Sequence, residues 1–185
     1  MGAVLATDLA NTSPVVRHTT GEALPDPAAL ERFLAEHGTG GGILAHTGRP
    51  SRNDLEQVHA LRGEVRAALQ ADEEELVERA NTLITGSGAG PLLRRDRDGR
   101  WQWCAVVPPG VPLAGELAAL AGVGMLGALR ALGHERFRRC ASPDCEGTFV
   151  DVSRAGRRRY CMPNLCGNRL NVANHRARRA RRPPA

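Results

Sequence analysis

The sequence predicts an α+β protein: a mainly helical N-terminal domain with a small β-hairpin, followed by a short C-terminal module. Three observations support this fold class. Apolar residues recur at helical spacing in several segments before residue 133. Two short apolar and aromatic segments flank an Asp-Gly pair, which is typical of a β-hairpin. Four of the five cysteines are crowded into 27 positions near the C-terminus.

The first element is predicted from an apolar run. Residues 3–6, Ala-Val-Leu-Ala, indicate a short strand. The polar residues that follow in 8–12, Asp-Leu-Ala-Asn-Thr, are typical of a cap or turn. We expect Asp8 and Asn11 to cap the next element or to form buried hydrogen bonds, and a ligand pocket is the alternative.

Helices are predicted for the segments that follow. One begins at Pro25-Asp26-Pro27 and runs to about His37. The next begins after Ser51, a good N-cap with Asp54 three residues on. Its apolar stripe consists of Leu55, Val58, Leu61, Val65 and Leu69. A further helix is expected over 72–84.

A hairpin and a long helix complete the N-terminal domain, for which we expect the bounds 1–132. The hairpin pairs 91–95 with 101–107 around Asp96-Arg97-Asp98-Gly99, and Cys104 is interpreted as a buried small residue. An Ala/Leu-rich helix then runs from about Leu113 to Leu132. Because glycine weakens a helix, Gly122 and Gly124 are predicted to mark close packing against a neighbour.

Charge separates the two ends of the chain. All 25 basic residues are arginine, and residues 137–185 hold 12 of them against three acidic residues, a formal +9, whereas residues 1–136 carry −4. This asymmetry favours a polyanion-binding module attached to a neutral or acidic domain. No apolar run reaches the roughly 18 residues of a membrane span, and no leader peptide is visible. We therefore expect a cytoplasmic protein with no membrane partner.

The cysteine spacing predicts one structural zinc ion. Cys140 and Cys145 form one close pair, and Cys161 and Cys166 form a second pair after 15 intervening residues. Two loops that each offer two thiolates provide the tetrahedral set that zinc prefers. Two disulfides or four unrelated thiols are the alternative. Four thiolates leave no open position for a catalytic water, so we expect the protein not to be an enzyme.

The elements of this module follow from the residues between the ligands. Segments 147–151 and 157–160 are predicted as two short strands, with Phe149, Val150 and Tyr160 as a small core. Cys166 is expected to begin the final helix, which gives a treble-clef-like finger. We expect the finger to span 137–182 and a short tail to occupy 183–185.

The last helix and the preceding basic run are candidates for nucleic-acid contacts. Arginine binds phosphate and guanine, and asparagine binds adenine. The candidate contact residues are Arg157, Arg158, Arg159, Asn171, Asn174, His175, Arg178, Arg179, Arg181 and Arg182. Asn168 and Arg169 are interpreted as structural, Asn168 by capping backbone and Arg169 by pairing with Asp151. DNA is the favoured partner, and RNA stays open.

The finger resembles the CGNR zinc-finger family. The residues that match its pattern are Arg139-Cys140, Cys145, Phe149-Val150-Asp151, Ser153-Arg154, Arg158-Arg159-Tyr160-Cys161 and Cys166-Gly167-Asn168-Arg169. The sequence departs from the pattern at Tyr160, where tryptophan is usual, and at Asn171, where lysine often follows.

The N-terminal region is similar to the ABATE domain of stress-induced transcription regulators. Residues 8–12 resemble its D-F-V-N-T opening, and Leu61-Arg62-x-x-Val65-Arg66 resembles a later helix. The resemblance implies a sensor or dimerisation domain, with a small-molecule effector or a homodimer as expectations, joined to a DNA-binding finger.

Two other classes of function stay open from the sequence. The finger could dock a protein partner without touching DNA. The N-terminal domain could hold an enzyme active site, although no cluster of catalytic residues is visible there.

Overall fold

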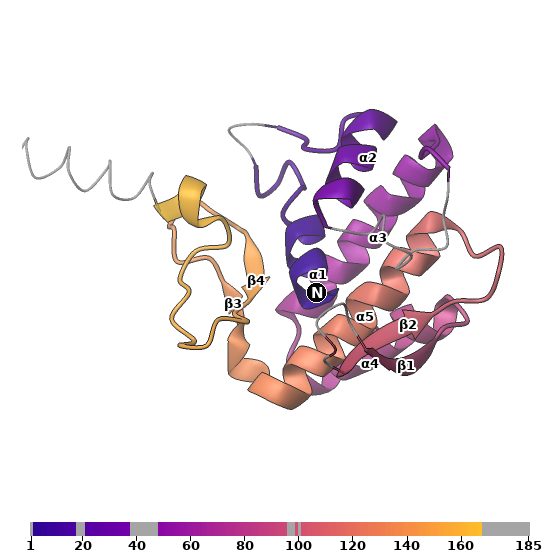
Figure 1. The fold of residues 1–185 in the computed structure, drawn as a ribbon. Helices are drawn as coiled ribbons and strands as arrows, with labels where there is room; N and C mark the ends of the chain where they lie inside the picture. The colour runs from indigo at the N-terminus through magenta and orange to yellow at the C-terminus, as the bar shows by residue number, and fades with distance from the viewer. Residues whose placement is uncertain (1, 18–20, 38–47, 96–98, 100, 168–185) are drawn as a thin grey trace, which may run out of the picture.

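The computed structural model describes residues 2–17, 21–37, 48–95, 99 and 101–167 (Figure 1). In these ranges the chain forms five α-helices, two separate two-stranded sheets, a short 3-10 turn and a terminal π-turn. The helices are α1 (Gly2–Ala10), α2 (Pro27–Glu36), α3 (Arg52–Gln70), α4 (Glu73–Gly86) and α5 (Leu113–Leu132). The strands are β1 (Gly90–Arg95), β2 (Trp101–Val106), β3 (Phe137–Arg139) and β4 (Thr148–Val150).

The first element is a helix, so the strand predicted for residues 3–6 was wrong. Ala6 and Ala10 lie one turn apart and are fully buried, as is Leu9. This face packs against α5 and α3. A four-residue apolar run does not distinguish a strand from a buried helix turn. The contact with α5 decides the conformation.

The four predicted helices are confirmed as α2 to α5. Side-chain caps explain where α2 and α3 begin. The Asp26 side chain accepts from the Ala29 backbone NH at the start of α2. Ser51 and Asp54 form the expected capping box of α3. The central helix is α5, which contacts α1, α3 and α4. It is long and apolar enough to cross a membrane, but its buried residues form the middle of this helical core.

Two glycines let α5 approach its neighbours closely, as predicted. A Cβ added at Gly124 would lie 2.3 Å from the Ala3 backbone nitrogen, and one at Gly122 would lie 2.7 Å from the Ala80 carbonyl oxygen. Gly127 on the same helix faces open space.

We expect Gly124→Ala to destabilise the protein by about 1–3 kcal/mol, because backbone rather than a movable side chain occupies the space. Gly127→Ala is the matched control, and it should stabilise α5 by up to about 1 kcal/mol. Urea unfolding followed by circular dichroism measures both. Equal effects of the two changes would contradict the packing argument.

The β1–β2 hairpin forms where the sequence predicts it, although the residues 96–98 and 100 of its turn lie outside the described part. Gly90 pairs with Val106 at the open end, and Arg95 pairs with Trp101 at the turn. The hairpin lies against α5 through β2. Cys104 is half-buried and donates its thiol hydrogen to the Leu92 carbonyl oxygen.

The second sheet differs from the hairpin predicted within the finger. The strand partner of β4 is β3, which precedes the first cysteine, and Phe137 pairs with Val150. Segment 157–160 forms no strand in the described structure, so that part of the prediction was wrong. Its main-chain contact is instead a hydrogen bond from the Ala141 NH to the Arg159 carbonyl oxygen.

An ion pair at the base of α2 links it to α1. The His37 Nε2 atom lies 3.0 Å from Asp8 Oδ2, and the His37 Nδ1 atom lies 2.8 Å from the Phe33 carbonyl oxygen. Only the imidazolium can donate to both acceptors at once. The hydrogen bond with Asp8 accordingly raises the pKa of His37, against the opposing effect of burial.

Because its folded pKa is raised, His37 stabilises the fold fully at a pH below about 6.5, and this stabilisation is lost as pH rises through the raised pKa. We expect His37→Gln to cost less than about 1 kcal/mol at low pH, since Asp8 is 40% exposed and screened. Urea midpoints of the wild type and the variant should differ at about pH 5.5 and approach each other at about pH 8.5. A difference that grows with pH would refute the pairing.

Candidate metal centre

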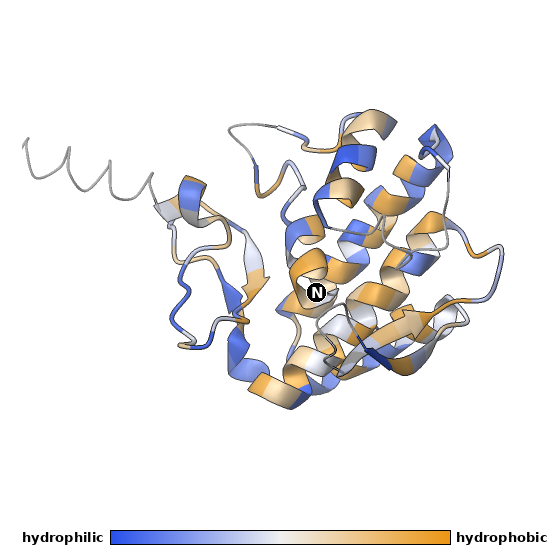
Figure 2. Ribbon diagram, in the orientation of Figure 1, coloured by the Kyte–Doolittle hydropathy of each residue, from blue (hydrophilic) through white to orange (hydrophobic). Residues whose placement is uncertain are grey.

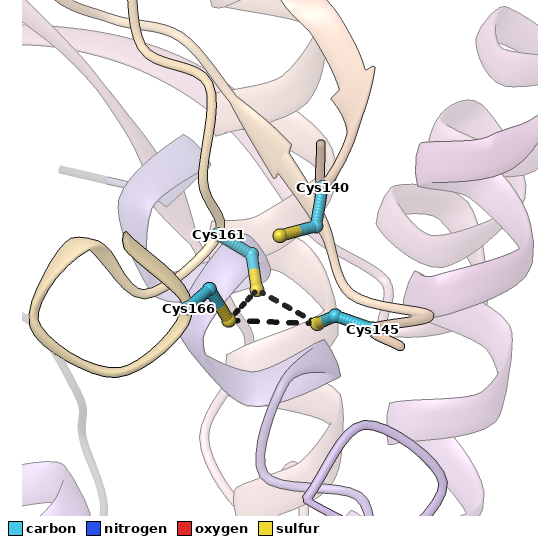
Figure 3. Close-up of side chains that lie close together, drawn as sticks. All are labelled: Cys140, Cys145, Cys161 and Cys166. Atoms are coloured by element: carbon cyan, nitrogen blue, oxygen red, sulfur yellow. Dashed lines mark hydrogen bonds between the residues drawn. The ribbon is translucent and has the colours of Figure 1, made fainter. Parts of the chain in front are cut away.

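Four cysteines converge at one end of the molecule. Cys140 follows β3, Cys145 precedes β4, and Cys161 and Cys166 come from the segment that ends in the π-turn Pro163–Gly167. Figure 3 shows their four sulfur atoms pointing toward a common centre. All four sulfur atoms lie within 4.8 Å of one another.

The distances fit a metal and exclude cross-links. The sulfur atoms of Cys145, Cys161 and Cys166 are 3.6, 3.7 and 3.6 Å apart. A disulfide needs about 2.05 Å, whereas a tetrahedron with zinc–sulfur bonds of about 2.3 Å has sulfur–sulfur edges of about 3.8 Å. All four cysteines are free thiols. They form a site for one structural zinc ion, which, when bound, ties two distant loops together.

The ionisation of the thiols shows why the site needs a cation. Burial and the neighbouring cysteines raise the pKa of Cys161 strongly, and burial raises the pKa of Cys166 to about 11. Burial also opposes ionisation of Cys140, but hydrogen bonds from the Cys161 and Ser142 backbones outweigh it and lower the pKa of Cys140. Four adjacent thiolates would therefore repel one another without a metal ion to offset their charge.

The loops around the first cysteine pair are built by short backbone contacts. The Cys140 NH donates to the Gly147 carbonyl oxygen over 2.8 Å, and the Gly147 NH donates to the Cys145 sulfur over 3.4 Å. A Cβ at Gly147 would lie 2.3 Å from the Cys161 sulfur. Glycine at this position therefore lets the two cysteine pairs approach each other.

Asp151 organises the rest of the finger from a fully buried position. Its carboxylate accepts from the Ser153 hydroxyl and NH and from the Arg158 NH, and it lies 3.5 Å from Arg138. Burial opposes its ionisation, but the bonds from Ser153 and Arg158 and the Arg138 charge together lower the pKa of Asp151. These contacts hold Asp151 within the finger, and its described ion pair is with Arg138; the pairing predicted with Arg169 lies outside the described residues.

The three arginines 157–159 have different surroundings. Arg158 donates to the carbonyl oxygens of Tyr160 and Cys161, and its guanidinium lies 4.7 Å from the centre of the Phe149 ring. Arg157 and Arg159 are exposed, and Arg159 also lies over Tyr160. Arg158 therefore supports the finger, whereas its two neighbours are accessible to a partner.

Side chains from α1 and from the residue that follows it bond to the edge of β4 that does not pair with β3. The Asn11 amide both accepts from the Thr148 NH, over 3.1 Å, and donates to the Thr148 carbonyl oxygen, over 2.7 Å. One turn earlier, the Thr7 hydroxyl accepts from the Val150 NH over 3.0 Å. These are the bonds that a third strand would make. The finger is thus joined to the helical domain as part of one structure.

Further contacts surround this junction. Val150 belongs to the main core, while Val16, from the segment after α1, packs in the smaller core around Phe149 and the cysteines. Glu146 forms an ion pair with Arg66 of α3 over 3.2 Å. The sequence motif at 8–12 contained the signal for this junction in Asn11, but nothing in the sequence identified Thr148 as its partner.

The ligand-pocket interpretation of Asp8 and Asn11 has no support in their contacts, because Asp8 is paired with His37 and both ends of the Asn11 amide are used by Thr148. The other predicted residues lie outside the described residues. These are Asn168, Arg169 and the proposed helix residues Asn171, Asn174, His175, Arg178, Arg179, Arg181 and Arg182.

The fold and the cysteine cluster define a zinc-finger protein with a helical N-terminal domain. Comparison with known families agrees: residues 136–179 match the CGNR zinc finger family. Residues 3–132 match the ABATE family, which is described as "Putative stress-induced transcription regulator". The chain belongs to the ABATE family. Among curated proteins, no significant match was found.

Proposed function

We propose that this protein is a zinc-dependent, DNA-binding transcription regulator that acts in the cytoplasm and has no catalytic activity. The proposal is supported most by the distribution of arginine around the zinc site. Four arginines of the described finger are exposed: Arg139, Arg154, Arg157 and Arg159. The sequence after Cys166 adds six more and no acidic residue.

The internal contacts of the finger sharpen this argument. Arg136, Arg138 and Arg158 are engaged by backbone carbonyls or Asp151. The exposed arginines are not needed for these contacts, so their charge is available to a polyanion. Phosphate backbones are the partner that such a charge favours. The family description supports a transcriptional role, and an effector or stress signal would act through the N-terminal domain.

Salt-dependent binding tests the proposal directly. The zinc-loaded protein should bind a fluorescent DNA duplex at low ionic strength, with an affinity that falls linearly on a log–log plot against salt. Arg157→Ala together with Arg159→Ala should reduce the slope by about 2 if each contacts one phosphate. Arg52→Ala, an exposed arginine at the start of α3, is the control and should leave the slope unchanged.

The alternative is a finger that binds a protein partner without touching DNA. This alternative would be favoured if the zinc-loaded protein did not bind DNA at low salt. It would also be favoured if the wild type and the Arg157→Ala, Arg159→Ala variant bound DNA equally well. The enzyme alternative gains no support from the two groups outside the finger whose pKa is shifted in the described structure. Glu22 forms an ion pair with Arg62, and His37 forms one with Asp8.

A further inference from the structure

The β1–β2 hairpin presents an apolar face to solvent. Of the eight large hydrophobic residues exposed in the described structure, five belong to it: Leu92, Leu93, Trp101, Trp103 and Val106. Trp101 is 58% exposed and Trp103 is 51% exposed. Concentrated exposure of this kind marks an interaction surface, whereas scattered single residues do not.

The strand register places three of these side chains, together with Arg95, on one face of the hairpin. Leu93 pairs with Trp103, and Arg95 pairs with Trp101. Directly paired residues share a face, and so do residues two apart on one strand. Arg95 also lies 4.5 Å over the Trp101 ring. We call Leu93, Arg95, Trp101 and Trp103 the tryptophan face; it contains both tryptophans of the protein.

The tryptophan face lies away from the zinc finger. In Figure 1 the finger projects at the left, and the hairpin lies at the lower right. The finger contacts α1 and α3, whereas the hairpin contacts α5. Figure 2 shows hydrophobic stretches in the hairpin together with a strongly hydrophilic one. Its position separates this surface from the basic face proposed to meet DNA.

Charge indicates what covers the face. Residues 90–106 hold four arginines and two acidic residues, whereas the rest of 1–132 holds eight arginines and 14 acidic residues. The hairpin is therefore a basic and apolar element on an acidic domain. A surface that complements it must be acidic with an apolar floor.

The same chain carries an acidic groove whose lining includes the apolar Leu83. A groove between α3 and α4 is lined by Glu64, Glu75, Glu78, Arg79, Thr82 and Leu83. Its three carboxylates outnumber its one arginine, which is already paired with Glu75 over 2.6 Å. Because α4 ends at Gly86 and β1 begins at Gly90, the groove and the hairpin are close neighbours along the chain.

We propose that the tryptophan face of one copy binds the acidic α3–α4 groove of a second copy, which gives a two-fold dimer. In this symmetry each copy donates its hairpin and accepts that of its partner, so both surfaces are covered at once. The dimer covers exposed tryptophan and pairs Arg95 with the carboxylates of the groove.

Sedimentation equilibrium of the zinc-loaded full chain tests this dimer. The mean mass should rise from 19.8 kDa toward twice that value as concentration increases over about 1–100 µM. Because both tryptophans lie on the proposed interface, their emission should shift to shorter wavelength over the same range. Trp103→Ser and Arg95→Glu should each shift the protein to the monomer, and Val15→Ser, at an exposed apolar residue elsewhere, should not.

A charge exchange makes the test independent of misfolding. Arg95→Glu and Glu78→Arg chains should each be monomeric, and their equimolar mixture should regain the dimer mass, which two misfolded chains would not do. A wild type that stays monomeric at all concentrations overturns the proposal, as does association that survives both hairpin variants. If Arg95→Glu left the mass unchanged but abolished DNA binding, the tryptophan face would bind nucleic acid instead. That result would also overturn the proposal.

Discussion

Removal of zinc is expected to unfold the finger while the helical domain keeps its structure. The core of the finger consists of Val16, Phe149 and the cysteines, with partly buried neighbours, and this is too little apolar area to fold alone. Structural zinc supplies about 10–16 kcal/mol to such modules. Without it, we expect the thiols to protonate and the two cysteine loops to separate.

The measurement is limited proteolysis of the chelator-treated protein. Cleavage should appear within 137–167, while a fragment close to residues 3–132 resists. Cys161→Ser should behave like the chelated protein and lose its zinc in metal analysis. Cys104→Ser, at the cysteine outside the cluster, should retain one zinc ion per chain. An unchanged cleavage pattern after chelation would show that zinc does not hold the finger.

The sequence predicted most of the fold because its signals are local. The caps at Asp26 and Ser51, the helical stripe of α3 and the hairpin flanking Asp98-Gly99 all act within a few residues. The zinc ligands were predictable for a similar reason, since each loop supplies two cysteines at short spacing. In these places the sequence and the tertiary contacts favour the same structure.

The errors arose where distant contacts decide the structure. Residues 3–6 are helical because Gly2 and Gly124 let α1 lie closely against α5. Residues 148–150 form a strand that pairs with β3. The same residues form hydrogen bonds with the side chains of Thr7 and Asn11, and these two residues are well over 100 positions away in the sequence. Local patterns contain no information on such partners. The sequence gives no sign of the contacts between residues 1–132 and the finger for the same reason.

Loss of the Asn11 side chain should reduce zinc affinity, although Asn11 is not a zinc ligand. Asn11→Ala leaves the Thr148 NH and carbonyl oxygen without partners, and Thr148 is fully buried. Two such groups cost about 2–4 kcal/mol. Because the finger is expected to fold only with zinc, this cost appears in the apparent zinc affinity. We expect a loss of roughly 30-fold or more.

Competition with a chromophoric chelator measures this loss. Thr7→Val should act in the same direction with a smaller effect, since it removes the one acceptor of the Val150 NH. Asn81→Ala, at an exposed residue of α4, is the matched control and should leave the affinity unchanged. If Asn11→Ala lowers thermal stability but not zinc affinity, the finger folds without α1. A reduced affinity would mean that any signal that moves α1 also alters zinc binding by the finger, because the two are joined by these hydrogen bonds.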